Sequence, residues 1–257
     1  MVRVVAVVGG KHSGKTTVIQ RLVYELERRG YKVGSVKEMP NADWIDVSGK
    51  ETWRYGEAGA EVVAGVARNE VALFIKKRLG LRDLMAFFAG LDYLFLLEGF
   101  EEERNIVRIV AAKDFVEAQI FHNDLTIAIS GLIAESKEEI KKASNLGVPI
   151  FNCITEADKL ADLIEQKALP LFPNLGRCGE CGYNSCHDLA RAIITGATSL
   201  RECPLLRKED VVLEVDGRVV PLKSFPSLFI KRTLIGMISS LNGIGQAKEI
   251  KVIVKAT

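Results

Sequence analysis

The chain has 257 residues, enough for one sizeable α/β core and something smaller, because domains commonly contain about 100–200 residues. Its 35 Lys and Arg residues nearly balance its 33 Asp and Glu residues, so no overall basic character points to nucleic acid or an anionic membrane as a partner. No apolar stretch has the length of about 18–20 residues that crosses a bilayer, and we therefore expect a soluble, cytoplasmic protein.

The first part of the chain alternates strand patterns with helical patterns. Residues 2–8 are apolar and β-branched, which is typical of a strand buried on both faces, and they lead into a glycine-rich segment rather than a signal-peptide cleavage site. Residues 15–29 place apolar side chains on one helical stripe, with Gly30 as the C-terminal cap. Further strands are expected at residues 32–36, 61–66, 71–75, 93–97, 106–111, 126–129 and 149–153, and further helices at residues 82–89, 137–146 and 158–167. This alternation predicts the α/β fold class, with a mostly parallel sheet flanked by helices.

The pattern changes after residue 169, where Pro170, Pro173 and Gly176 interrupt the chain before a group of cysteines. Beyond this group, an Asp216-Gly217 pair between two short apolar runs predicts a β-hairpin. A helix at residues 226–241 and a strand at residues 250–255 are expected to follow. The expected parts are a nucleotide-binding domain at residues 1–169, a small cysteine-cluster domain at residues 170–208 and a small α+β unit at residues 209–257.

A phosphate-loop (P-loop) motif, Gly-x4-Gly-Lys-Thr, lies between the first expected strand and the first expected helix. Its glycines let successive backbone N–H groups face the phosphates of a nucleotide, and the helix N-terminus adds partial positive charge. We expect Lys15 to reach the β- and γ-phosphates, and the Thr16 hydroxyl to be a ligand of Mg²⁺. The residues expected to hold a nucleoside triphosphate are Gly9, Gly10, Lys11, His12, Ser13, Gly14, Lys15, Thr16 and Thr17.

Acidic residues are the next requirement of a P-loop site, because Mg²⁺ and the attacking water must be positioned. Glu98 follows the apolar strand expected at residues 93–97, and the carboxyl ends of strands are where open α/β sheets bind ligands. We therefore expect Glu98 to contact Mg²⁺ or its water shell. Asp43 and Asp46 could serve the same ion, although a solvated acidic loop explains them equally well.

An ordered series of further motifs accompanies the P-loop: GYKVGSVK at residues 30–37, DWID at 43–46, GKETWRYGEAGA at 49–60 and LLEGF at 96–100. Over roughly the first 165 residues, this series resembles MobB, the molybdopterin-guanine dinucleotide biosynthesis accessory protein B family. The resemblance implies a GTP-binding, weakly hydrolysing and commonly homodimeric α/β protein. It also implies a role in attaching GMP to molybdopterin, with a molybdopterin guanylyltransferase or a pterin-dependent apoenzyme as partner.

The resemblance also implies roles for individual residues, so that Lys15, Asp46 and Glu98 are expected to serve in catalysis. Two segments depart from the family pattern. Residues 38–42 read EMPNA where the family often has histidines, and residues 101–104 read EEER where a proline-lysine segment is usual. No Asn-Lys-x-Asp base-reading motif is present, so a preference for GTP over ATP rests on the resemblance.

The second candidate site consists of Cys178, Cys181, Cys186 and Cys203, spaced as Cys-x2-Cys-x4-Cys-x16-Cys. Four thiolates suit either a 4Fe-4S cluster or tetrahedral zinc. Structural zinc sites usually pair two Cys-x2-Cys units, whereas here the third and fourth cysteines are single and are separated by a helix expected at residues 187–197. This asymmetry favours 4Fe-4S, with zinc as the alternative. The segment also resembles the small four-cysteine 4Fe-4S domain of corrinoid iron-sulfur proteins.

Two further side chains near these motifs are given simpler interpretations. His187 follows Cys186 directly, but four thiolates are already available, so we expect it at the surface or beside a ligand. Cys153 stands apart from the other cysteines at the end of an expected strand, where it is most simply a small buried hydrophobic residue.

Three functional hypotheses combine these motifs. The first is an accessory GTPase of molybdenum or tungsten pterin cofactor biosynthesis, whose cysteine segment senses redox state or docks a partner. The second is an ATP-gated iron-sulfur electron donor. The third is a non-enzymatic, nucleotide-dependent adaptor that delivers a cofactor to an apoenzyme. The resemblance favours the first.

Overall fold

The computed structural model describes residues 1–39, 41–97, 105–173, 178–206, 211–216, 218–220, 222, 224–241, 250–252 and 254. The chain forms two compact units, Met1–Leu171 and Phe172–Thr257. Among the described helices, none combines the length and the apolar character needed to cross a bilayer. The division at residue 208 that the sequence suggests within the second unit stays a prediction.

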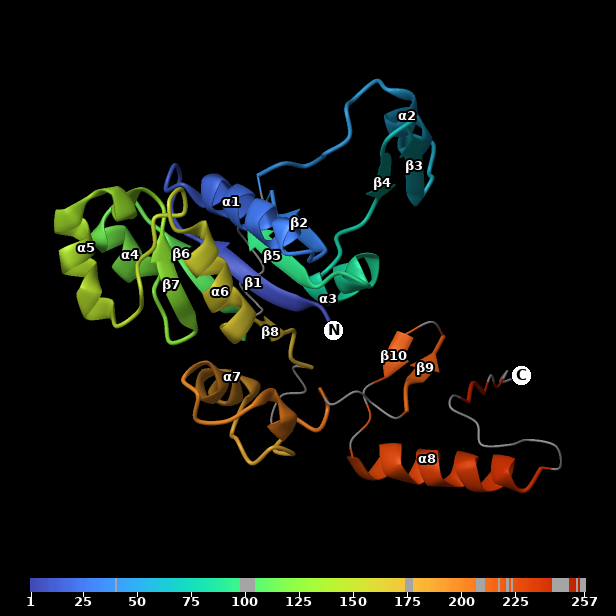
Figure 1. The fold of residues 1–257 in the computed structure, drawn as a ribbon. Coiled ribbons are helices and arrows are strands. Elements are labelled where there is room, and N and C mark those ends of the chain that lie inside the picture. The colour runs from blue at the N-terminus through green and yellow to red at the C-terminus, as the bar shows by residue number, and fades with distance from the viewer. Residues whose placement is uncertain are drawn as a thin grey trace. The chain divides into compact units, whose positions relative to one another are not determined.

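The first unit is built on one twisted sheet (Figure 1). Its parallel strands lie in the order β2 (Val33–Lys37), β5 (Tyr93–Leu97), β1 (Arg3–Val8), β6 (Val107–Ala111) and β7 (Thr126–Ser130). The short β8 (Leu169–Pro170) pairs antiparallel with β1. The β-branched run in β1 suits a strand in the centre of the sheet, and Val4, Val5 and Val7 are at most 1% exposed. The predicted α/β class and mostly parallel sheet are confirmed.

Helices cover both faces of this sheet. On one face, Val4 of β1 and Leu94 of β5 pack with α3 (Leu81–Leu84) and with the 3-10 helix η1 (Met85–Phe88). Val110 of β6 has the same orientation, because the register pairs it with Val8. It packs against the helices α4 (Phe115–Phe121) and α5 (Lys137–Ala143).

The other face is covered by α1 (Lys15–Arg28) and α6 (Ala157–Lys167), which contact each other. Arg29, directly after α1, joins them because its Nη1 lies 2.7 Å from both Asp162 Oδ1 and Glu165 Oε1. The main chain leaves α1 through Gly30, whose φ of 88° lies in the left-handed region as expected for the cap.

The strands expected at residues 61–66 and 71–75 are present, but they form a hairpin of their own. β3 (Val62–Val66) and β4 (Val71–Ile75) pair antiparallel as a separate two-stranded sheet, with α2 (Glu51–Glu57) beside β3. The connection at residues 67–70 is too short for a parallel crossover, and Ala67 N–H donates to Glu70 O at 2.9 Å. The chain therefore turns back instead of joining the main sheet.

Other elements differ from the expectation in extent. The strand expected at residues 149–153 is reduced to a bridge between Ile129 and Ile150. The helix expected at residues 82–89 is α3 followed by η1, and the one expected at 137–146 is α5 followed by η3 (Ser144–Leu146). Some short elements, whose periodicity is weak, were not predicted from the sequence: α2, α4, β8 and η2 (Leu132–Glu135).

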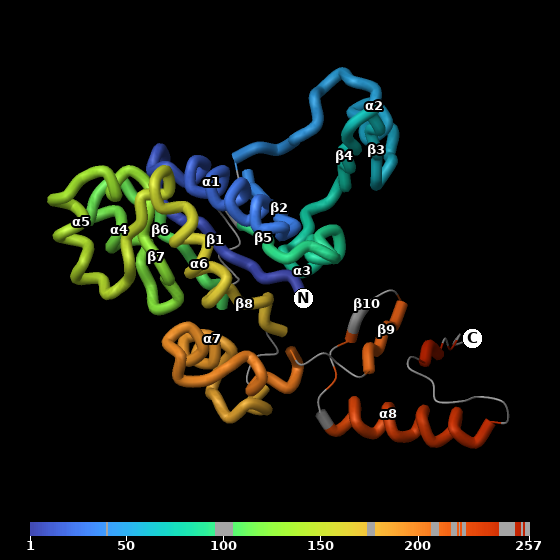
Figure 2. The backbone as a smooth tube through the Cα atoms, viewed as in Figure 1, coloured from blue at the N-terminus to red at the C-terminus, as the bar shows by residue number. Residues whose placement is uncertain are grey.

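The second unit begins with α7 (Cys186–Ile194) and η4 (Leu200–Glu202), which Figure 2 traces with the rest of the backbone. A hairpin of β9 (Leu213–Val215) and β10 (Arg218–Val220) follows, and Asp216 at its turn has a φ of 51°. The last helix is α8 (Ser224–Ser239). The strand expected at residues 250–255 is wrong as far as the chain is described, because residues 250–252 and 254 carry no strand.

Candidate nucleotide and cysteine sites

The P-loop connects the carboxyl end of β1 to the first turn of α1, as its motif requires. Gly9 and Gly14 have φ values of 152° and 94°, and His12 has a φ of 59°. Gly9 also lies so close to β6 that a Cβ at this position would overlap the carbonyl oxygen of Ala111. The backbone of Gly9 therefore requires glycine for two reasons, its dihedral angle and its contact with the neighbouring strand.

Lys15 points back into the loop. Its side-chain Nζ donates to the carbonyl oxygens of Gly9 at 2.8 Å and of Gly10 at 2.6 Å, and the residue is only 8% exposed. A positive charge is thus held at the centre of a curled backbone at a helix N-terminus, an arrangement that favours anions. The remaining predicted loop residues Lys11, His12, Thr16 and Thr17 are exposed.

The residues directly after β7 pack against one side of the P-loop. Leu132 N–H donates to the carbonyl oxygen of Ser13 at 3.4 Å, and a Cβ on Gly131 would overlap that same oxygen. Ser13 is 1% exposed, and its Oγ has no hydrogen-bond partner among the described residues. Sequence reasoning missed Gly131, since a single glycine after a strand carries no distinctive signal.

Glu117 of α4 also packs against the P-loop, and this contact was not predicted from the sequence. Its carboxylate lies against Gly10, where a Cβ would overlap Oε1. The backbone N–H of Lys113 donates to Glu117 Oε2 at 2.7 Å, and Asp114 caps α4 by accepting from Glu117 N–H at 2.8 Å. An Asp followed three residues later by Glu is a capping pattern that could have revealed this helix.

Asp46 is held by the hairpin region. It accepts hydrogen bonds from Val47 N–H at 2.9 Å and Thr52 Oγ1 at 3.0 Å, and Lys76 Nζ lies 3.5 Å from its Oδ2. The same ammonium lies 5.3–5.7 Å from the ring centroids of Trp44, Trp53 and Phe74. Within the described part of the chain, no hydrogen bond of Asp46 reaches the P-loop. Glu98 and the acidic residues 101–103 lie outside the described residues.

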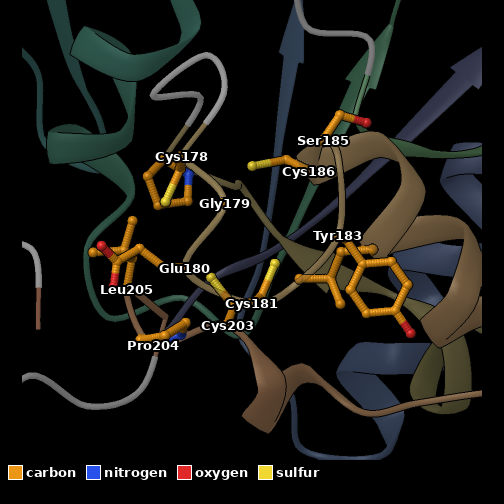
Figure 3. Close-up of a pocket in the computed structure, with 12 residues that line it drawn as sticks. Cys178, Gly179, Glu180, Cys181, Tyr183, Ser185, Cys186, Cys203, Pro204 and Leu205 are labelled. Carbon is orange, nitrogen blue, oxygen red and sulfur yellow. The ribbon is translucent and has the colours of Figure 1, made fainter.

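The four predicted cysteine ligands line one pocket in the second unit, and Figure 3 shows their thiols directed towards it. None of these four cysteines is in a disulfide bond, and Gly179 and Gly182 adopt φ values of 70° and 79° that curl the chain around the first pair. Cys186 is the first residue of α7, whose cap Ser185 accepts from Asp188 N–H at 3.1 Å. The residues lining the pocket include Pro173, Tyr183, Leu189, Pro204 and Leu205 but not His187.

The thiols of the pocket differ in burial. Cys203 is 5% exposed, and burial raises the pKa of its thiol, whereas hydrogen bonds from the backbone N–H groups of Leu205 and Leu206 lower it. The other three thiols are partly exposed. The described residues contain no group of three His, Cys, Asp or Glu side chains gathered closely enough to hold a single metal ion.

Cys153 lies in the first unit and is 4% exposed. Burial raises the pKa of its thiol, and a hydrogen bond with Ser130 acts in the opposite direction. The interpretation of Cys153 as a small buried residue agrees with this environment.

Comparison with known proteins identifies the family of the first unit. The model of the MobB family, molybdopterin guanine dinucleotide synthesis protein B, matches residues 4–133. The chain belongs to the MobB family. The predicted resemblance to MobB is therefore confirmed.

MobB relatives match different parts of the chain. A Methanocaldococcus jannaschii protein named as a molybdopterin-guanine dinucleotide biosynthesis adapter protein is 28% identical over 254 residues, covering 97% of this chain and 96% of that protein. A Bacillus subtilis protein named as such an adapter is 29% identical over 58% of this chain and 84% of its own length. The crystal structure of Bacillus subtilis MobB is similar with a TM-score of 0.51 and 26% identity, covering 63% of this chain and 97% of that one.

A second family model, named for an Fe-S cluster, matches residues 177–205. This range contains all four cysteines of the pocket. The MobB region and the cysteine segment thus correspond to two different family models on one chain.

Proposed function

We propose that this MobB-family protein is a GTP-binding adapter in molybdopterin-guanine dinucleotide biosynthesis and that it also carries a 4Fe-4S cluster. The observation that supports nucleotide binding is the conformation of the P-loop, which curls around the Lys15 ammonium. The names of the relatives support the pathway. The partner would be a molybdopterin guanylyltransferase or a pterin-dependent apoenzyme, and the protein would act as a homodimer.

In this proposal, the backbone N–H groups of the P-loop and the Lys15 ammonium bind the phosphates of GTP. The exposed Thr16 hydroxyl in the first turn of α1 is a ligand of Mg²⁺. Glu98 and Asp46 remain the proposed acidic partners of this ion, and the hydrogen bonds of Asp46 to the hairpin region make it the weaker of the two candidates.

Calorimetric titration of the full chain with Mg²⁺ and either GTP or ATP tests the proposed nucleotide binding. We expect GTP to bind more tightly than ATP, and Lys15→Ala to remove binding, because the central positive charge is lost. Absence of GTP binding to the wild-type protein would contradict the proposal.

The chemistry of the cysteine pocket supports the proposed 4Fe-4S cluster. Four cysteines that form no disulfide share one pocket, the thiol of Cys203 receives backbone N–H hydrogen bonds, and the first turn of α7 begins at Cys186. Backbone donors and a helix N-terminus both favour thiolates and the negative charge of an iron-sulfur cluster. A bound cluster would supply one-electron redox chemistry.

The proposed 4Fe-4S cluster is tested by anaerobic purification, followed by iron, sulfide and zinc analysis and a visible absorption spectrum. The expected result is brown protein with about four iron and four sulfide ions per chain. Colourless protein containing zinc would overturn the assignment.

A second candidate function is an ATP-gated iron-sulfur electron donor, favoured by the partial exposure of Cys178, Cys181 and Cys186 at the pocket. Such exposure would give a redox partner access to the cluster. The reduction potential measured with and without bound nucleotide separates the two functions. A shift produced by ATP but not by GTP would favour the electron donor over the adapter.

A further inference from the structure

A groove with a volume of about 460 Å³ adjoins the cysteine pocket in the second unit. The groove is formed by the loop before α7, by α7 itself and by the residues directly after this helix. Asn184, Arg191 and Thr195 line it and are exposed, so the groove is open to solvent. Among the described residues, Tyr183 alone lines both the groove and the cysteine pocket. Its side chain therefore separates the two.

The cysteine pocket is better closed away from Tyr183. Leu189 of α7 is 0% exposed, and Leu205, close after the last cysteine, is 9% exposed. Tyr183 itself is half-buried. Figure 3 shows its hydroxyl directed away from the four thiols, so the aromatic ring rather than the polar end lies towards the pocket. An apolar ring is thus the wall between the cysteines and the solvent in the groove.

The backbone on both sides of Tyr183 is fixed. Gly182 has a φ of 79°, and its N–H donates to Gly179 O at 3.1 Å. At the other end, Ser185 caps α7 by accepting from Asp188 N–H at 3.1 Å and donating from Oγ to Asp188 Oδ2 at 2.7 Å. The turn and the cap that place the cysteines on either side therefore also hold the ring of Tyr183 in position.

We propose that Tyr183 is a shielding residue of the cysteine site, whose ring keeps water and dissolved oxidants in the groove away from the thiolates and from a bound 4Fe-4S cluster. The inference rests on the proposed cluster. It goes further by assigning the groove as the side from which small solutes approach the site. The apolar surroundings of a metal site control solvent access, and with it the reduction potential and the reactivity of the metal.

Tyr183→Ala should open the cysteine pocket to the groove, whereas Tyr183→Phe keeps the ring. When anaerobically purified full-length protein is exposed to air, its visible absorption should disappear about tenfold faster in Tyr183→Ala than in the wild type. Tyr183→Phe should behave as the wild type, because the hydroxyl points away from the thiols. Tyr183→Leu retains a smaller apolar side chain and should give an intermediate rate.

The reduction potential provides a second measurement. A cluster held by four thiolates carries net negative charge and gains one more on reduction, and water stabilises that charge. The potential of Tyr183→Ala should therefore be less negative than that of the wild type, and the potential of Tyr183→Phe should be unchanged.

Asn184→Ala is the matched control, because Asn184 is the next residue and lines the groove without lining the cysteine pocket. Both its rate of bleaching in air and its reduction potential should stay at the wild-type values. Equal acceleration in Asn184→Ala and Tyr183→Ala would overturn the inference, because it would show a general loosening of the loop.

Iron content measured before exposure to air distinguishes failure of this inference from failure of the proposed cluster. Tyr183 supplies no ligand, so every variant should contain as much iron as the wild type. If the wild type contains no iron, the proposed cluster fails and the inference fails with it. If the wild type contains iron but Tyr183→Ala bleaches at the wild-type rate with an unchanged potential, the inference fails alone. Loss of iron from both Tyr183→Ala and Tyr183→Leu during anaerobic purification would also overturn it, because the ring would then be needed to assemble the site rather than to shield it.

Discussion

The carboxylate of Glu117 packs against Gly10, so closely that a Cβ on Gly10 would overlap its Oε1. The carboxylate is fixed there from the other side. Lys113 N–H donates to Oε2 at 2.7 Å, and Lys113 Nζ lies 3.6 Å from Oε1. The first turn of α4 therefore packs against the P-loop, although it contributes nothing to the P-loop motif.

Gly10→Ala should lower the free energy of unfolding by about 1–3 kcal/mol and weaken nucleotide binding, because the new Cβ displaces Glu117 from its hydrogen bond. The three atoms nearest to this Cβ all belong to the side chain of Glu117, and the φ of Gly10 is outside the left-handed region. Glu117→Ala should therefore restore much of the loss in the double variant. Urea unfolding and GTP titration of the two single variants and the double variant measure this coupling.

Gly9→Ala is the control for that rescue. Its Cβ would overlap the backbone carbonyl of Ala111, and its φ of 152° strains any other residue. Glu117→Ala should not rescue it. Equal rescue of both glycine variants would mean that Glu117 acts through general loosening of the loop rather than through contact with Gly10.

Asp46 and Lys76 form a second pair that can be tested, because both tryptophans of the chain lie beside it. The side chain of Asp46 is 5% exposed and that of Lys76 is 16% exposed. Asp46→Ala should destabilise the hairpin region by about 1–3 kcal/mol, since it leaves the ammonium and Thr52 without their acceptor. Tryptophan fluorescence during urea unfolding reports this change directly.

Lys76→Met is the companion variant, because methionine keeps contact with the aromatic rings while removing the charge. A smaller loss of stability than in Asp46→Ala is expected. The measurement also tests the sequence-based catalytic interpretation of Asp46. An Asp46→Ala protein with an unchanged fluorescence transition but no GTP hydrolysis would support catalysis over the hairpin role.

The sequence predicted those features that depend on local chemistry. The P-loop follows from fixed spacing between a β-branched strand and an amphipathic helix, and the four cysteines from their spacing alone. The contact between Glu117 and Gly10 could not be predicted, because it joins a short helix of weak periodicity to a loop distant in sequence. The environment of Asp46 was hidden for a similar reason, since Lys76 reaches it only after residues 67–70 reverse the chain.

Glu25 gives the first unit a predictable acid sensitivity. Its side chain is 8% exposed, and hydrogen bonds from Arg28 and Arg29 lower the pKa of the carboxyl to about 2 from an ordinary value of 4.5. The deprotonated form is thus favoured in the folded state. Its contribution to stability is complete above pH 4.5 and is lost as the pH falls towards 2.

Glu25→Gln should therefore lower the free energy of unfolding by about 1–2 kcal/mol at pH 7 and reduce its decline between pH 4.5 and pH 2. Urea unfolding followed by circular dichroism at several pH values measures both effects. Glu27→Gln is the matched control, because it removes a carboxylate from an exposed position on the same helix. A wild-type slope in Glu25→Gln would refute the assignment.

Cys178 and Cys153 provide the sharpest test of the cysteine site, because both are free thiols but only Cys178 lines the pocket. Cys178→Ser should lose most of the bound iron and the visible absorption after anaerobic purification, since a serine hydroxyl does not supply the thiolate that an iron-sulfur cluster requires. Cys153→Ala should retain the iron content and spectrum of the wild type. Retention of iron in both variants would show that the metal is bound elsewhere, and loss in both would show that iron content follows general stability rather than ligation.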